Sequence, residues 1–252
     1  MKNLFRKITQ ILALTLVCSS WGISNAGNNT VINSIKNGES KATKDYLQKG
    51  GDVNFIDNEG NSLLFYALIA KNHSIAKMLL EKGANPNVKN KYGAPALVTA
   101  AGSGYTEIVT LLLKKGAEPN AKFARYDNVS ALMLAAQDGY SEIVDVLIKF
   151  GADVNSETDN GDTALIAATA KGNLPIIKKL LKNGAKVDVR SESGYSALFI
   201  AISEDNEEVV NYLLKNGANP NLSDDNKDTA LKLAIRLKNP NIIRALEKAG
   251  AK

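Results

Sequence analysis

"GADVNSETDNGDTALIAA", residues 151–168, joins a Gly-Ala step to a polar, turn-rich run and then to an apolar stretch that opens at Thr163. The same order of residues recurs along the chain. One leucine of the apolar stretch returns at spacings of 33, 35, 33, 33 and 33 residues, as Leu64, Leu97, Leu132, Leu165, Leu198 and Leu231. The Gly-Ala step keeps the same period, from Gly83-Ala84 to Gly250-Ala251. The chain is therefore an array of repeated units.

Each unit encodes two helices. "TALIAATAKGN" opens at Thr163, a favoured N-cap residue, and its small apolar face ends at Gly172. "LPIIKKLLKNGA" then has Pro175 in its first turn, apolar residues at helical spacing, and Gly184 as the terminating residue. The polar run 153–162 has Asn and Gly near its centre, which favours a tight projecting turn. A unit therefore reads as a turn, a short helix and a longer helix.

This pattern resembles the ankyrin repeat, which has a period of 33 residues and consists of a β-turn and two helices. The matching stretches are "YGAPALVTAAGSGYTEIVTLLLKKGAEPN", "NVSALMLAAQDGYSEIVDVLIKFGADVN" and "NGDTALIAATAKGN" followed by "LLKNGA". The resemblance covers essentially all of the chain after residue 26. It implies an all-α solenoid of helix-turn-helix units with projecting β-turn tips.

The chain departs from the family's Thr-Pro-Leu-His pattern in two ways. Alanine replaces the proline in five units, at Ala96, Ala131, Ala164, Ala197 and Ala230. The histidine is replaced by Phe65, Val98, Met133, Ile166, Phe199 and Lys232. We therefore expect the family's hydrogen-bond network at this motif to be missing, and the apolar replacements to pack between units.

The period predicts a division of the chain into eight segments. Residues 1–26 form a leader, 27–56 a divergent or capping repeat, and six repeats follow at 57–89, 90–122, 123–155, 156–188, 189–221 and 222–252. The last unit is rich in charged residues, including Lys227, Arg236 and Lys248, as expected for a cap that meets water.

Residues 1–26, "MKNLFRKITQILALTLVCSSWGISNA", have the pattern of a secretory signal peptide. A basic start precedes a short apolar run, and Ser24-Asn25-Ala26 provides small residues for cleavage after Ala26. The run is too short to be a convincing membrane span. We expect a mature chain that begins at Gly27 and is exported to the periplasm or out of the cell. A retained anchor and a lipid-modified Cys18 are the open alternatives.

Cleavage would change the charge of the protein. The leader holds three of the 31 basic residues and none of the 26 acidic ones, which leaves a mature net charge of +2. Basic and acidic residues are interspersed through every unit, whereas a nucleic-acid binder needs a concentrated basic face. The single Cys is also in the leader, so apolar packing must stabilise the mature chain. We expect a monomer that binds neither nucleic acid nor membrane.

We find no catalytic or cofactor signature after residue 26. His73 is the single histidine and is expected in a solvated turn. The "GSG" at 102–104 lacks the lysine of a phosphate-binding loop, so Gly104 reads as an interhelical turn. Acidic pairs such as Asp224-Asp225 have no calcium-ligand spacing. The chain therefore predicts no catalytic residue, no cofactor and no metal, and the protein is not expected to be an enzyme.

The resemblance implies a protein partner held by the turn tips and a concave groove. The tip positions are Asn58, Glu59, Asn61, Lys91, Tyr92, Tyr126, Asp127, Val129, Asp159, Asn160, Asp162, Glu192, Ser193, Tyr195, Asp225, Asn226 and Asp228. Tips of stacked repeats lie side by side, so residues about 33 apart are expected to form one ridge. The predicted partner-binding residues are Tyr92, Arg125, Tyr126, Asp159, Asp162 and Tyr195. Tyrosines flanked by carboxylates suit a partner with a basic and apolar surface.

The 35-residue interval places two extra residues in "AKFARYDN" before the third unit. A longer loop costs little, so the insertion is expected to project without disturbing the helices. Phe123, Arg125 and Tyr126 are then a candidate hook, with Phe123 folded back onto the neighbouring units as the alternative. Lysines of the second helices, such as Lys114, Lys149 and Lys178, are not expected to contribute to binding of the partner.

The sequence therefore predicts an exported, non-enzymatic adaptor that binds a protein. Resemblance to small exported bacterial ankyrin proteins implies a periplasmic enzyme or a host protein as the partner. The alternatives from other classes are a surface-tethered structural element and an enzyme with a cryptic site.

Overall fold

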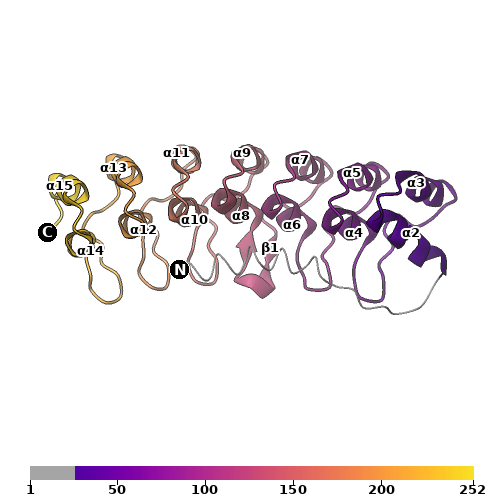
Figure 1. The fold of residues 1–252 in the computed structure, drawn as a ribbon, viewed down its shortest axis with the longest axis horizontal. Helices are drawn as coiled ribbons and strands as arrows, with labels where there is room; N and C mark the ends of the chain where they lie inside the picture. Colours follow the sequence, from indigo (N-terminus) through magenta and orange to yellow (C-terminus); the bar gives the residue numbers. More distant parts are fainter. Residues whose placement is uncertain (1–25) are drawn as a thin grey trace. The chain divides into compact units, whose positions relative to one another are not determined.

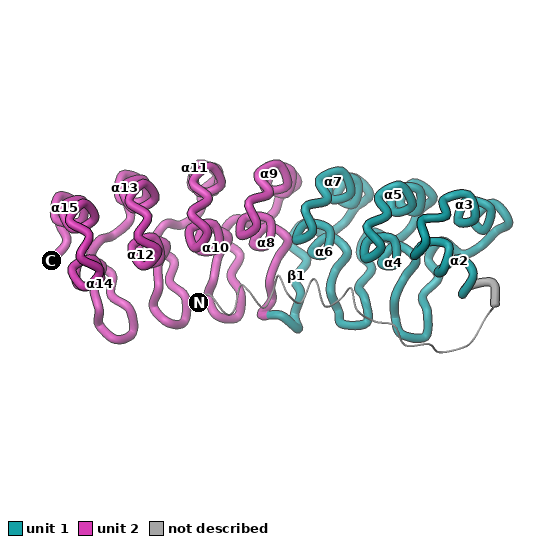
Figure 2. The backbone as a smooth tube through the Cα atoms, viewed as in Figure 1, with its two compact units in different colours: residues 1–126 teal, residues 127–252 magenta. Residues whose placement is uncertain are grey.

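The computed structural model describes residues 26–252. The predicted leader lies outside the described residues except for Ala26. The chain divides into two compact units, with unit 1 ending at Tyr126 and unit 2 beginning at Asp127 (Figure 2). The division falls inside the long turn that the 35-residue interval predicts. Each unit is described by itself below.

Unit 1 contains three helix pairs, with each projecting turn on the same side of its pair (Figure 1). The first pair comes from the segment that the sequence marks as divergent. The elements of unit 1 are α2 (Ala26–Lys36), α3 (Ser40–Gln48), α4 (Leu63–Ile69), α5 (His73–Glu81), α6 (Ala96–Gly102), α7 (Thr106–Lys114), strand β1 (Lys122–Phe123) and the short 3-10 helix η1 (Ala124–Tyr126).

Unit 2 contains four helix pairs in the same arrangement. Its elements are strand β2 (Val129–Ser130), α8 (Ala131–Asp138), α9 (Ser141–Lys149), α10 (Ala164–Ala170), α11 (Leu174–Lys182), α12 (Ala197–Ser203), α13 (Glu207–Lys215), α14 (Ala230–Leu237) and α15 (Pro240–Lys248). The prediction of an all-α array is confirmed. No helix in residues 26–252 is long and apolar enough to cross a membrane.

Hydroxyl side chains begin most of the first helices. The Thr163 hydroxyl accepts a hydrogen bond from the backbone N–H of Ile166 at 3.3 Å, which satisfies one of the N–H groups that a helix start leaves without a partner. Ser62, Ser130, Ser196 and Thr229 accept equivalent bonds at the starts of α4, α8, α12 and α14. Pro95 precedes α6 and makes no such bond. The sequence therefore sets these helix starts locally.

The glycine of each Gly-Ala step ends a second helix. These glycines have φ between 86° and 93°, in the left-handed region that residues with a Cβ rarely adopt. The alanine that follows donates its N–H back into the helix, as Ala185 does to the Leu180 carbonyl at 3.0 Å. Carbonyls at the helix end are thereby satisfied, which explains why the step recurs with the period.

Apolar side chains between neighbouring pairs form the core. In unit 1, α4 packs against α2 and α6; in unit 2, α10 packs against α8 and α12. The residues at the family's histidine position are buried at Phe65, Val98, Met133, Ile166 and Phe199, whereas Lys232 is exposed. The five apolar replacements therefore lie in the core, as expected.

A row of asparagines joins successive pairs at the base of the turns. In unit 1, the Asn87 side-chain amide donates to the Gly116 carbonyl at 3.0 Å, and its oxygen accepts from the Glu118 N–H at 2.9 Å. Asn54 in unit 1, and Asn155 and Asn221 in unit 2, bridge to the next pair in the same way. Asp188 occupies this position between them and only accepts a bond, from Asn219 at 2.9 Å. The turns are therefore fixed to the helix pairs that follow them.

Candidate functional site

The first residue of three projecting turns stabilises the turn through its side chain. The Asp57 carboxylate accepts from the backbone N–H groups of Glu59 and Asn61 at 2.9 and 2.8 Å. Asn90 and Asp224 make the same pair of bonds in their own turns. Short polar side chains can replace backbone partners in this way. The one or two residues at the tip are therefore presented by a turn that is already hydrogen-bonded.

At three turns the last position is covered and does not belong to the tip surface. Asn61, Val129 and Asp162, which the sequence assigns to the tips, are only 8%, 3% and 9% exposed. Tyr195 and Asp228 occupy the same position in later turns and are only half-buried, so the position alone does not decide the burial. Asp162 offers a partner little surface, and its place in an exposed ridge is corrected.

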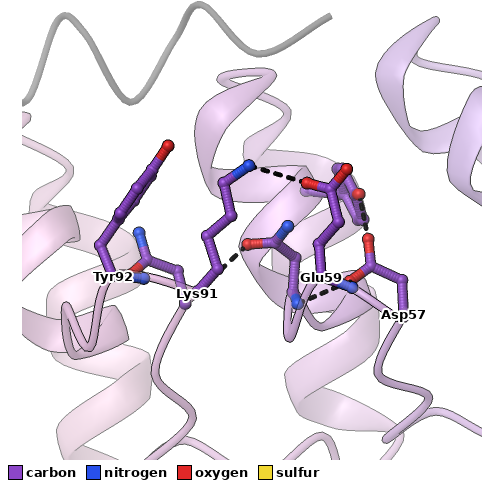
Figure 3. Close-up of polar contacts among 7 residues, drawn as sticks. Asp57, Glu59, Lys91 and Tyr92 are labelled. Atoms are coloured by element: carbon purple, nitrogen blue, oxygen red, sulfur yellow. Dashed lines mark hydrogen bonds and ion pairs between the residues drawn. The ribbon is translucent and has the colours of Figure 1, made fainter. Parts of the chain in front are cut away.

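Unit 1 brings together two of the predicted site residues. The Arg125 guanidinium lies over the Tyr92 ring, 5.3 Å from its centroid, and the Lys91 amine is also 5.3 Å from that centroid. Lys91 reaches back to the Glu59 carboxylate at 2.8 Å, while Tyr92 extends beside it (Figure 3). Cations at this distance are attracted to an aromatic ring. We name Glu59, Lys91, Tyr92 and Arg125 the Tyr92 cluster.

A second polar contact in unit 1 was not predicted from the sequence. The Tyr66 hydroxyl donates a hydrogen bond to the Asp57 carboxylate. The Lys36 amine lies 4.8 Å from the centroid of the Tyr66 ring. Burial, followed by the bond to Asp57, raises the pKa of Tyr66 and keeps its hydroxyl protonated. No periodic signal could have indicated Lys36, because it lies in the divergent segment.

The inserted loop does not form the predicted hook. Phe123 is 4% exposed, and the half-buried Tyr126 ring packs edge-on against it with centroids 4.7 Å apart. Burying an aromatic ring away from water lowers the free energy of the folded state, so the loop folds over Phe123 and does not expose it. Of the three predicted hook residues, Arg125 alone is exposed.

The first residues of unit 2 are hydrogen-bonded to the turn that follows them in the sequence. The Asp127 carbonyl accepts from the Asp159 N–H at 3.0 Å, and the Asn160 side-chain amide donates to the Asp127 carboxylate. Asn128 donates to the Asp159 carboxylate at 2.5 Å. Burial, followed by repulsion from Asp127, raises the pKa of Asp162 to about 6. Asp159 therefore already has a partner within the chain, although it is exposed.

Tyr195 lies in the next turn, which is hydrogen-bonded to the turn of Asp159 because the Glu192 N–H donates to the Asn160 carbonyl at 2.8 Å. Its half-buried ring packs against Phe199 in α12, with centroids 5.1 Å apart. Arg190, near the same turn, donates to the Asp225 carboxylate at 3.4 Å and to the Gly194 carbonyl at 3.2 Å. The structure thus pairs Tyr92 with Arg125, places Tyr126 on Phe123, and gives Asp159 and Tyr195 separate contacts. The assignment of the six residues to a partner surface stays a prediction.

The remaining candidates have structural surroundings. His73 is the first residue of α5, where it is exposed and its ring packs on Tyr105 with centroids 4.2 Å apart. In the part of the chain that the structure describes, no group of His, Cys, Asp and Glu side chains is arranged to hold a metal ion. Lys114, Lys149 and Lys178 are exposed on second helices.

Comparison with known proteins adds one finding. A family model described as ankyrin repeats (3 copies) matches residues 28–123, 124–191 and 171–252. The comparison with curated proteins gave no match. The family model covers nearly all of the residues that the structure describes, and its repeats generally mediate interactions between proteins.

Proposed function

Because the chain belongs to the ankyrin-repeat family, we propose that it is an exported adaptor that binds a protein partner through its turn tips. The adaptor carries out no reaction of its own. Its projecting turns act as a rigid support, and the side chains at their tips select the partner.

The observation that carries this proposal is the contrast between the turn and its tip. In unit 1, the turns that begin at Asp57 and Asn90 are held by hydrogen bonds to these first side chains, and Asn87 ties its turn to the following helix pair. The tips nevertheless present a half-exposed Tyr92 and an exposed Arg125 in unit 1. Tyrosine and arginine are enriched among the residues that contribute most to protein interfaces. Presenting Tyr92 on a turn that is already hydrogen-bonded lowers the entropy lost on binding.

The experiment has two stages. The purified protein captures a partner, and the dissociation constant is then measured for variants of the tips and of the second helices. We expect Tyr92→Ala, Tyr126→Ala and Tyr195→Ala to weaken binding. The loss should be about tenfold or more for the tyrosine that lies at the centre of the interface. Lys114→Ala and Lys149→Ala are the controls, since both lysines are exposed on second helices. Loss of binding in the lysine variants alone would contradict the proposal, and circular dichroism checks that each variant folds.

Export is tested separately. N-terminal sequencing of the protein recovered from the periplasm or the medium should begin at Gly27, because Ser24-Asn25-Ala26 suits signal peptidase cleavage. A lipid-modified start at Cys18 would favour a tethered protein, and membrane fractionation with Cys18→Ala as the control distinguishes the two. Recovery of the uncleaved chain from the cytoplasm would contradict export.

A further inference from the structure

Arg125 differs from the other arginines in the described part of the chain. Arg190 donates to the Asp225 carboxylate at 3.4 Å, and Arg236 donates to the Asp228 carboxylate at 2.7 Å. Arg244 donates to the Pro240 carbonyl at 3.2 Å. Within residues 26–252, the Arg125 guanidinium has no carboxylate or carbonyl partner, and its one interaction is with the Tyr92 ring.

The contact with Tyr92 leaves the donors of Arg125 available. A guanidinium lies over an aromatic ring through its planar face, whereas its five N–H groups point outward from its edge. The attraction holds the guanidinium near the ring and takes up none of its hydrogen bonds to oxygen acceptors. Arg125 is exposed at the tip of the inserted loop, so a molecule approaching the turns can reach this edge. A fork of N–H donors in this geometry matches a carboxylate, which it binds through two parallel hydrogen bonds.

The charge of the Tyr92 cluster points to the same ligand. Lys91 and Glu59 form an ion pair at 2.8 Å, so the two charges offset each other. The charge that remains in the cluster is that of Arg125. Electrostatic complementarity selects a partner of opposite sign at such a surface. The half-exposed Tyr92 ring beside the guanidinium adds apolar area for a neighbouring side chain.

We propose that the Tyr92 cluster is a docking site for an acidic segment of a protein partner, in which an Asp or Glu carboxylate binds Arg125 and an adjacent apolar side chain packs on Tyr92. This rests on the proposed function and specifies the partner's chemistry. It differs from the expectation from the sequence, which favoured a basic partner because it grouped Tyr92 with Asp159 and Asp162. Asp162 is buried, and Asp159 accepts a hydrogen bond from Asn128.

The test uses a phage-displayed library of random dodecapeptides selected on the purified protein. We expect the enriched peptides to be rich in Asp and Glu next to apolar residues, and their binding to weaken as salt is added. Fluorescence anisotropy then gives dissociation constants for individual peptides. Arg125→Ala should weaken binding by about tenfold or more, the size expected for losing a hydrogen bond to a charged group. Arg125→Lys should restore it only in part, because lysine lacks the two-pronged geometry.

Arg244→Ala is the matched control, since it removes the same charge from an exposed arginine on α15. Equal losses in Arg244→Ala and Arg125→Ala would overturn the proposal, because they would indicate attraction to net charge alone. Enrichment of Lys- and Arg-rich peptides would overturn it as well, as would binding that survives both Arg125→Ala and Tyr92→Ala. Peptides that lose binding on Tyr195→Ala but not on Arg125→Ala would overturn the docking site while supporting the proposed function. Failure to enrich any peptide, together with failure to capture a protein, would count against both.

Discussion

At the scale of a single residue, Asp162 shows what burying a carboxylate costs this fold. Its pKa is raised to about 6, so the folded state binds its proton more tightly than the unfolded state does. The stability that protonated Asp162 contributes is present at low pH and is lost as the pH rises from about 4 to 6. Asp162→Asn should therefore stabilise the protein at pH 7.5, by on the order of 2 kcal/mol.

The measurement is urea unfolding of both proteins at several pH values. The free-energy difference between variant and wild type should shrink as the pH falls towards 4. A difference that is the same at pH 5 and pH 7.5 would show that the charge of Asp162 is not the cause.

Asp188 provides a second prediction at this scale. It occupies a position in the asparagine row but, as a carboxylate, cannot donate to the glycine carbonyl as Asn155 does to Gly184 at 3.0 Å. Asp188→Asn should add one hydrogen bond, to Gly217, and stabilise the fold by roughly 1 kcal/mol. Asn155→Asp makes the reverse change and should destabilise it. Thermal unfolding should show midpoints shifted in opposite directions, by about 2–4 °C per kcal/mol; equal shifts in one direction would contradict the role assigned to the amide.

At the scale of an element, the hydroxyl at each first-helix start makes a separate contribution. Thr163→Ala removes the bond to the buried N–H of Ile166 and should cost about 1 kcal/mol of stability. Thr163→Ser keeps the hydroxyl and should retain most of that free energy. Chemical unfolding compares the three proteins. If Ser were as damaging as Ala, the methyl group of Thr163 and not its hydroxyl would be what α10 needs.

The elements were largely predictable from the sequence, whereas the tip contacts were not. N-cap hydroxyls, helical spacing of apolar residues and Gly-Ala steps are local signals, and each repeats with the period. The asparagine row also had a signal, the residue that closes "GADVN" and "GANPN", but its role was missed. The contact of Arg125 with Tyr92 and the burial of Phe123 depend on how side chains turn within an irregular loop. Asp162 is buried, whereas Tyr195 at the equivalent position is only half-buried. Sequence spacing sets a residue's register but not that direction.

At the scale of the whole molecule, equivalent residues have different surroundings along the array. Ile202 is fully buried in unit 2, whereas Ile235, 33 residues later, is 56% exposed in the structure. Ile202→Ala should cost about 2–4 kcal/mol, since it removes buried methyl groups and leaves a cavity. Ile235→Ala should change stability by less than about 1 kcal/mol. Urea unfolding of the two variants tests this pair, and a large loss at Ile235 would mean that this side chain is covered in solution.

The asparagine row has a consequence for how such a chain can change in length. Each asparagine bridges from its own pair to the next and reaches no further, as Asn87 does between its turn and the residues around Gly116. Since the bonding groups are a side-chain amide and main-chain atoms, the junctions that carry an asparagine are chemically alike, whereas the Asp188 junction lacks the amide donor. An in-frame gene duplication that copies a single period would therefore bring its own connection at both ends. A module copied or removed by recombination would therefore keep this polar connection to its neighbours.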